Sequence, residues 1–375
     1  MSVFWHRTTR ISAASLLFLS GCAADSSSEP PQSREGRPVV EFSEATADST
    51  QWYDSDIQAP EGVTTTLNIK EFKVTAVTRN QYSTVKILDD VIVTRKGINS
   101  WTYPDKVEWP EYPVDFYEVS PVDVKWEVFW WHKGVAIYGW ENTGTTDLVV
   151  GAQYGAVSRP GPIKVNLRHA LASVDVSLRT DIPDRYSMTV KRAYIMEVNS
   201  GGNYNWPTQT TDQQSPYDVG TPEVSGDWYQ VWTGNHNNVY NLQGYPEEDY
   251  KGTELKPSDI YTPLDQHLVR FMVPGSLIKS NYTGSEWRGS NIMIVYRITD
   301  RNTGETIWPT ASTSASLRAP KDSGWALACY GLYDVTPDHK WLAGINYRYR
   351  LTLHLPPEAG TRASDSDISV SIAPY

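Results

Sequence analysis

The sequence predicts an all-β protein built from two tandem antiparallel β-sandwiches. Its 15 Trp and 23 Tyr favour sheet, because aromatic side chains suit half-buried pleated surfaces. In addition, 25 Gly and 24 Pro separate short segments in which apolar and polar residues alternate or apolar residues follow one another, as they do in strands. No helical period is interleaved with these segments, which favours antiparallel sandwiches over βαβ units. Residues 38–375 exceed what one hydrophobic core usually organises, so two domains are expected.

The first 22 residues have the pattern of an export signal. A basic start precedes the apolar run 11–19, which is too short to span a bilayer. The run ends in Leu-Ser-Gly-Cys, residues 19–22, which resembles the bacterial lipobox. That resemblance implies cleavage before Cys22 and lipidation of its thiol, so that the mature protein is anchored to a membrane. The alternative is an ordinary secretory signal with a chance cysteine.

Residues 23–37 predict a flexible tether, because they are rich in Ser, Pro and charge and lack an apolar period. Arg34 and Arg37 are candidate sites for a trypsin-like protease in this tether. Pro38 follows Arg37, and such enzymes cleave poorly before proline, so Arg34 is the better candidate. A cut at Arg34 would release the lipid but leave the expected first strand in place.

The segments with strand patterns divide at the turn-like sequence Thr-Asp-Ile-Pro-Asp, residues 180–184. The N-terminal sandwich, residues 38–180, is expected to hold strands at 39–42, 65–78, 85–93, 114–119, 135–140, 148–152 and 163–178. The C-terminal sandwich, residues 181–375, is expected to hold strands at 186–198, 228–232, 267–273, 291–299, 325–333, 347–355 and 368–372. Between these, residues 201–263 are rich in Asn, Gln, Pro, Gly and Asp and predict long loops.

The C-terminal segment 366–375 is a candidate donor strand. Ile368, Val370 and Ile372 alternate with serines, so one face of the strand would be buried and the other would not. Such a segment can complete its own sandwich as the last strand, or it can insert into another subunit. Both possibilities stay open at this point, because the period does not say whose sheet the strand joins.

Four segments of the chain carry a family resemblance. They are VEWP at 107–110 with VDFYEVSP at 114–121, DLVVGA at 147–152, IKVNLRHALASV at 163–174, and WLAGINYRYRLTL at 341–353. In this order they resemble the fimbrillin-like subunits of type V pili of Gram-negative gut and oral bacteria. Arg168, Ser173 and Ala343 depart from that family, which has Phe, Lys and Pro there. The resemblance implies that the two sandwiches are transthyretin-like.

The resemblance also implies a function, that of a stalk, tip or anchor subunit of an adhesive pilus. A lipid-anchored precursor would reach the outer membrane and cell surface, a protease would trim it, and other pilus subunits would join by donor-strand exchange. The membrane would be reached through the lipid on Cys22. The alternative is a monomeric surface lipoprotein that binds a host glycan or protein ligand through Trp-rich loops. Trp206 and Trp287, in loop-like sequence, are then the candidate contacts.

Other kinds of chemistry find little support in the sequence. The net charge of -11 disfavours nucleic acid as a partner. Cys329 lies among apolar residues and predicts a buried, inert thiol. The histidines are scattered without zinc-site spacing, and His169 is expected to be packed and hydrogen-bonded. No catalytic motif is present, so no enzyme activity, metal or cofactor is predicted; a glycosidase with paired carboxylates is the third alternative.

Overall fold

The described residues of this protein, in a computed structural model, are almost all in β-strands. They are residues 37–47, 63–79, 84–97, 99–129, 134–158, 161–199, 201–206, 238–241, 252–255, 257–258, 260–264, 270–356 and 368–374, all within one compact unit of residues 33–375. Two 3-10 helices, η1 (Ala315–Leu317) and η2 (Pro337–His339), are the only helices in these ranges. No helix among the described residues is long and apolar enough to cross a membrane. The all-β prediction is confirmed.

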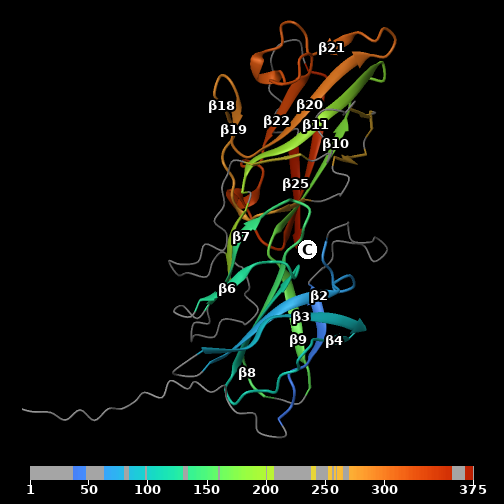
Figure 1. Ribbon diagram of the computed structural model, residues 1–375. Helices are drawn as coiled ribbons and strands as arrows, with labels where there is room; N and C mark the ends of the chain where they lie inside the picture. The colour runs from blue at the N-terminus through green and yellow to red at the C-terminus, as the bar shows by residue number, and fades with distance from the viewer. Residues whose placement is uncertain are drawn as a thin grey trace, which may run out of the picture. The chain divides into compact units, whose positions relative to one another are not determined.

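The largest sheet has seven strands in the order β1-β9-β8-β5-β2-β3-β4 (Figure 1). Its strands are β1 (Phe42–Ala47), β2 (Glu71–Arg79), β3 (Thr84–Gly97), β4 (Ser100–Thr102), β5 (Val114–Ser120), β8 (Val149–Ala156) and β9 (Ile163–His169). All neighbours pair antiparallel except β1 and β9, which pair parallel. The central strand β5 is buried along residues 114–119, on both of its faces.

Both faces of the seven-stranded sheet are covered. One face carries a core that includes Phe72 and Phe116. The other face, with Tyr117 and Val119, packs in a second core that also takes in side chains of a three-stranded sheet. That sheet is formed by β12 (Gly201–Asn205), β7 (Gly134–Glu141) and β6 (Trp126–Phe129). A strand covered on both faces needs apolar residues on both of them. Along its buried positions β5 meets this need except at Asp115 and Glu118, which are buried acidic residues.

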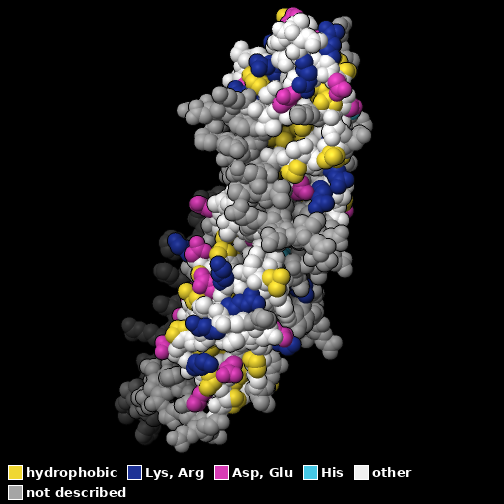
Figure 2. Space-filling model, turned by 90° about the vertical axis from the view of Figure 1, so that its right-hand side faces the viewer, with side chains coloured by type: hydrophobic (Ala, Val, Ile, Leu, Met, Phe, Trp, Pro, Cys, Tyr) yellow, Lys and Arg dark blue, Asp and Glu magenta, His cyan; other side chains and the backbone are white. Residues whose placement is uncertain are grey.

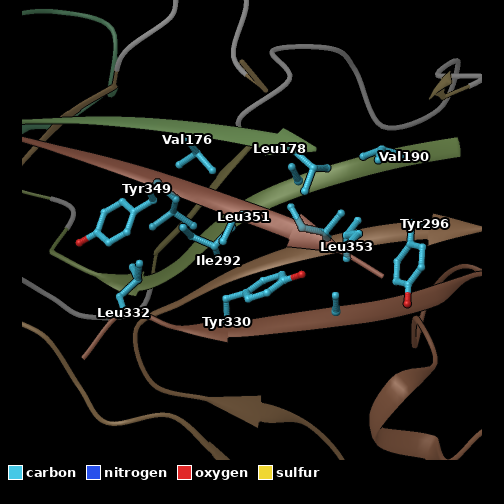
Figure 3. Packing of buried hydrophobic residues seen from close by; sticks show 14 of the residues in the cluster. Val176, Leu178, Val190, Ile292, Tyr296, Tyr330, Leu332, Tyr349, Leu351 and Leu353 are labelled. Carbon is cyan, nitrogen blue, oxygen red and sulfur yellow. The ribbon is translucent and has the colours of Figure 1, made fainter. Parts of the chain in front are cut away.

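Two further sheets enclose the largest core. A five-stranded sheet has the order β15-β10-β24-β25, with β16 also on β10, and a six-stranded sheet has the order β13-β11-β20-β21, with β14 on β11 and β22 on β20. Figure 3 shows side chains of β10 and β24 pointing toward those of β20 and β22. The bounds are β10 (Ala172–Thr180), β11 (Tyr186–Val198), β13 (Asn238–Asn241), β14 (Thr253–Leu255), β15 (Thr262–Pro263), β16 (Arg270–Met272), β20 (Asn291–Asp300), β21 (Thr306–Trp308), β22 (Ala326–Gly331), β24 (Ile345–Leu353) and β25 (Ile368–Pro374).

Two small two-stranded sheets complete the described strands. One pairs β17 (Gly275–Ser276) with β23 (Lys340–Trp341), and the other pairs β18 (Asn281–Tyr282) with β19 (Trp287–Arg288). The second pair lies beside the six-stranded sheet, since Trp287 packs with Met293 of β20 in a small cluster. This cluster occupies the face of the six-stranded sheet opposite the main core, because Met293 alternates with the core residues Ile292 and Ile294.

The structure differs from the predicted strand set in several respects. Residues 201–263, which were expected to form long loops, contain the strands β12, β13, β14 and β15. The single strand expected at 163–178 is two strands, since β9 joins the seven-stranded sheet and β10 joins the five-stranded sheet. The expectation of purely antiparallel sheets is also wrong, because β1 pairs parallel with β9 and β10 pairs parallel with β24. The expected strand at 228–232 lies outside the described residues. The domain division at residue 180 and the transthyretin-like topology stay predictions.

Candidate functional site: the terminal strands at the sheet edges

Strand β1 inserts an apolar row into the core of the seven-stranded sheet. Val40, Phe42, Ala45 and Ala47 are all buried, at 0 to 4% exposure. The Phe42 ring meets three aromatic rings, those of Phe72, Tyr103 and Phe116, at centroid distances of 5.8, 5.7 and 6.1 Å in edge-to-face geometry. These contacts make β1 an integral part of the core although it is the edge strand of the sheet.

The backbone of this N-terminal segment is held on two sides. On one side β1 pairs with β9 from Phe42↔Ile163 to Ala47↔Leu167, and the Ile163 N–H donates to Glu41 O at 2.7 Å. On the other side, the Trp109 N–H donates to Pro38 O at 3.0 Å, and the Val40 N–H donates to Val107 O at 2.8 Å. Residues 38–47 therefore bridge β9 and the segment 107–109, and their side chains fill the apolar groove between.

Arg37 is tied to the folded protein just before this segment. Its Nη2 lies 2.5 Å from Glu111 Oε1, and its Nη1 donates to Trp109 O at 3.3 Å. The side chain is 19% exposed, so Arg37 is less accessible than a tether residue is expected to be. Cys22 and Arg34 lie outside the described residues.

The C-terminal strand β25 is the edge strand of the five-stranded sheet. It pairs antiparallel with β24 over seven positions, from Ile345↔Pro374 to Leu351↔Ile368. Val370 is partly buried against the main core, whereas Ile372, two residues on and on the same face, is 42% exposed. The predicted burial of one face therefore holds for Val370 and is incomplete for Ile372. The backbone of Ile368 is described, but its side chain is not.

The prediction that Trp206 and Trp287 are exposed is wrong. Trp206 is fully buried, its indole N–H donates to Gly151 O at 2.9 Å, and its ring lies 5.5 Å from that of Trp126. Trp287 is 8% exposed, and its indole N–H donates to Ser316 O at 2.9 Å. Loop-like composition misled the prediction, because β12 and β19 are short strands that return each indole to a core. The alternation in Tyr204-Asn205-Trp206 is the local signal from which β12 could have been predicted.

The segments that carry the sequence resemblance form interior structure. In the second segment, Asp147 Oδ2 accepts from the Thr64 N–H at 2.9 Å and lies 2.8 Å from His169 Nδ1, with both side chains almost fully buried. The prediction that His169 is packed in the interior is confirmed, with its ring against the Asp147 carboxylate. In the last segment, the Trp341 indole N–H donates to the Tyr349 hydroxyl at 2.9 Å. Because these residues are buried and hold strands together, they are not available to a partner. The candidate functional site is therefore the pair of terminal strands, β1 and β25.

Two other buried side chains, Glu118 and Cys329, carry titratable groups. Glu118 is buried in β5, and desolvation raises the pKa of its carboxyl to about 8. Cys329 is buried, as predicted, in the cluster beside β19. Within the described ranges, no group of three or more His, Cys, Asp or Glu side chains could hold a metal ion.

Comparison with known proteins gave matches among solved structures only. No protein-family model matches the chain, and no curated protein matches it. A fimbrial protein of Bacteroides vulgatus is 12% identical, with 80% of this chain and 91% of that chain covered and a TM-score of 0.45. A fimbrilin of Porphyromonas gingivalis is 10% identical, with 90% and 97% covered and a TM-score of 0.42. A C-terminally truncated tip fimbrial protein of P. gingivalis is 9% identical, with 82% and 94% covered and a TM-score of 0.33.

Proposed function

We propose that this chain is a structural subunit of an adhesive cell-surface pilus, joined to its neighbours by exchange of a sheet-edge strand. The observation that carries the proposal is the segment 38–47, whose apolar row is buried and whose backbone bonds the segment 107–109 through residues 38–40 and pairs with β9 through β1. Such a strand is replaceable by another extended segment, because the groove recognises a backbone edge and a period-two apolar row.

The energetics favour keeping the groove filled. Burial of a Val or Phe side chain contributes about 1.5–3 kcal/mol, so loss of Val40 and Phe42 alone would expose a substantial apolar surface. An empty groove would also leave the edge of β9 unpaired, which invites pairing with another chain. On the face in Figure 2, hydrophobic side chains of the described residues are interspersed with charged ones.

The donor in this proposal is the segment 366–375. Its strand β25 is at a sheet edge, and Ile372 already exposes apolar surface. One chain's β25 would leave β24 and enter the groove of the next subunit, where Val370 and Ile372 would take the places of β1 side chains. The exchange conserves strand pairing for the acceptor while linking the two chains.

The position of the subunit depends on where it is cut. No Lys or Arg occurs between Arg37 and Lys70, so a protease specific for basic residues that cuts at Arg34 leaves β1 in its groove. A chain that retains β1 can donate a strand but cannot accept one, which suits an end of the pilus such as the anchor. Cleavage by a different protease within residues 48–62 would instead make it a stalk subunit. The lipid on Cys22 would hold the uncut chain at the outer membrane.

The test uses the chain from Cys22 onward without lipid, cut either with an Arg-specific protease or with one that cuts at acidic or aromatic residues within 48–62. We expect detergent-resistant multimer ladders only after the second cut, and none when residues 366–375 are deleted. Ile372→Asp should weaken the ladder, whereas the matched control Ser371→Asp, on the opposite face of β25, should not. A strictly monomeric product under every protease would refute the proposal.

A further inference from the structure

The outer face of the six-stranded sheet contains a cavity of about 600 Å³. Methionine and aliphatic side chains of β11, β20 and β22 form its floor, and the walls are the hairpin β18–β19 and the segment 315–322. This volume lies within the range of small-ligand sites, and the predominance of apolar and aromatic lining with a few polar groups is typical of them. The terminal strands β1 and β25 contribute nothing to it, so the cavity is separate from the site of strand exchange.

Aromatic side chains make one wall of this cavity. The Trp287 ring lies 5.4 Å from the Tyr282 ring at an interplanar angle of 52°, and the Trp287 indole N–H is fixed by Ser316 O. Tyr194 of β11 also lines the cavity, and its hydroxyl accepts from Arg192 Nη1 at 3.3 Å. Rings held in this way present rigid apolar surface with little conformational entropy to lose on binding.

The charges around the cavity leave a cationic excess. Asp322 is compensated by Lys191 at 2.5 Å and by Arg192 at 3.5 Å, while Glu286 pairs with Arg288 at 2.6 Å. Two further cations of the wall, Arg318 and Lys321, make no ion pair within the described part of the chain.

These two cations differ in their structural roles. Arg318 donates to the carbonyl oxygens of Thr310, Ala311 and Thr313 at 2.7–2.8 Å, which braces the wall. Lys321 is exposed and makes no hydrogen bond among the described residues. Its ammonium is therefore available to a bound anion, although the protein as a whole carries a net charge of -11.

We propose that this cavity binds an acidic saccharide, a sugar ring that carries a carboxylate. The apolar C–H face of the ring would pack on the half-buried Tyr282 and on the edge of Trp287 that lines the cavity, and the carboxylate would receive charge-assisted hydrogen bonds from Lys321, with Arg318 adding positive potential. A volume of about 600 Å³ accommodates one or two sugar rings, whereas an extended peptide strand needs an open groove along a sheet edge. The inference goes beyond pilus assembly and requires no exchange of strands.

Calorimetry on the full chain from Cys22 onward tests this inference with glucuronate and glucose, which differ by the carboxylate. We expect glucuronate to bind and glucose to bind at least about tenfold more weakly, since a charge-assisted hydrogen bond is lost. Lys321→Gln should reduce glucuronate affinity about tenfold and leave glucose binding unchanged. The matched control is Lys125→Gln, which alters an exposed lysine outside the cavity and should change neither.

A second variant separates binding from folding. Trp287→Phe keeps an aromatic side chain but loses ring area, and it should weaken both sugars while far-ultraviolet circular dichroism stays unchanged. Equal affinity for glucose and glucuronate, no binding of glucuronate at millimolar concentration, or an undiminished affinity in Lys321→Gln would each overturn the inference. Displacement of bound glucuronate by an acidic peptide at lower concentration would overturn it as well, in favour of a peptide site.

Discussion

Phe42→Ala tests whether β1 can detach from its groove independently of the rest of the fold. Phe42 is 4% exposed and packs edge-to-face on Phe72, Tyr103 and Phe116. Truncating a buried Phe to Ala costs about 3–5 kcal/mol. Because β1 lies at the sheet edge and at the start of the described fold, we expect this loss to lower the free energy of local opening of β1.

Hydrogen exchange of backbone amides measures that opening. A loss of about 3 kcal/mol makes the open state about 100-fold more populated, so amides of residues 42–47 should exchange about 100-fold faster. Amides of β8, in the interior of the same sheet, should change far less. The control is Glu41→Ala, which removes only an exposed ion pair with Lys106 and should alter exchange by less than about fivefold. Equal acceleration of β1 and β8 would refute the reasoning, because β1 would then open only with the whole domain.

Three further predictions concern buried polar and aromatic groups. The pKa of Glu118 is raised to about 8, so between about pH 4.5 and pH 8 the folded state holds a proton that the unfolded state releases. The free energy of unfolding should therefore fall as pH rises through this window. Glu118→Gln should flatten this pH dependence, measured by urea denaturation. Asp147→Ala leaves buried His169 without its carboxylate and should lower the unfolding free energy by about 2–3 kcal/mol, measured by urea denaturation at pH 7. Trp206→Ala should cost about 3–5 kcal/mol by the same assay, whereas an unchanged stability would contradict its burial.

The break between β9 and β10 shows why one strand boundary escaped prediction. Residues 163–178 contain no Gly or Pro to mark the end of a strand, and the only local sign of a break is the apolar run Ala170-Leu171-Ala172, which interrupts the alternation. The change of sheet is fixed by distant partners instead. The Ala170 N–H donates to Leu148 O at 2.8 Å, and Leu171 O accepts from the Gly344 N–H at 2.8 Å. A pattern of period two reports which face is buried, but it does not report which sheet supplies the next strand.

The tryptophan predictions failed for a related reason. Trp206 and Trp287 stand in sequence rich in turn-forming residues, where exposure is the ordinary expectation. Both side chains are buried because the short strands β12 and β19 pair with β7 and β18, respectively, and this pairing places each indole in a core. Strands of two to five residues carry too few positions for a period to be recognised.

The sequence by itself determined the fold class, the principal strands and the interior role of His169, because period, punctuation and aromatic content are local properties that burial selects. It also raised the terminal segments as candidates, through the alternation of Val370 and Ile372 and the basic residues before Pro38. Only the tertiary structure decided that the segment 38–47 connects β9 with residues 107–109, that β25 pairs with β24, and which strands pair parallel. Those outcomes depend on contacts between residues far apart in the chain, and strand pairing over such distances is set by the packing of the whole core.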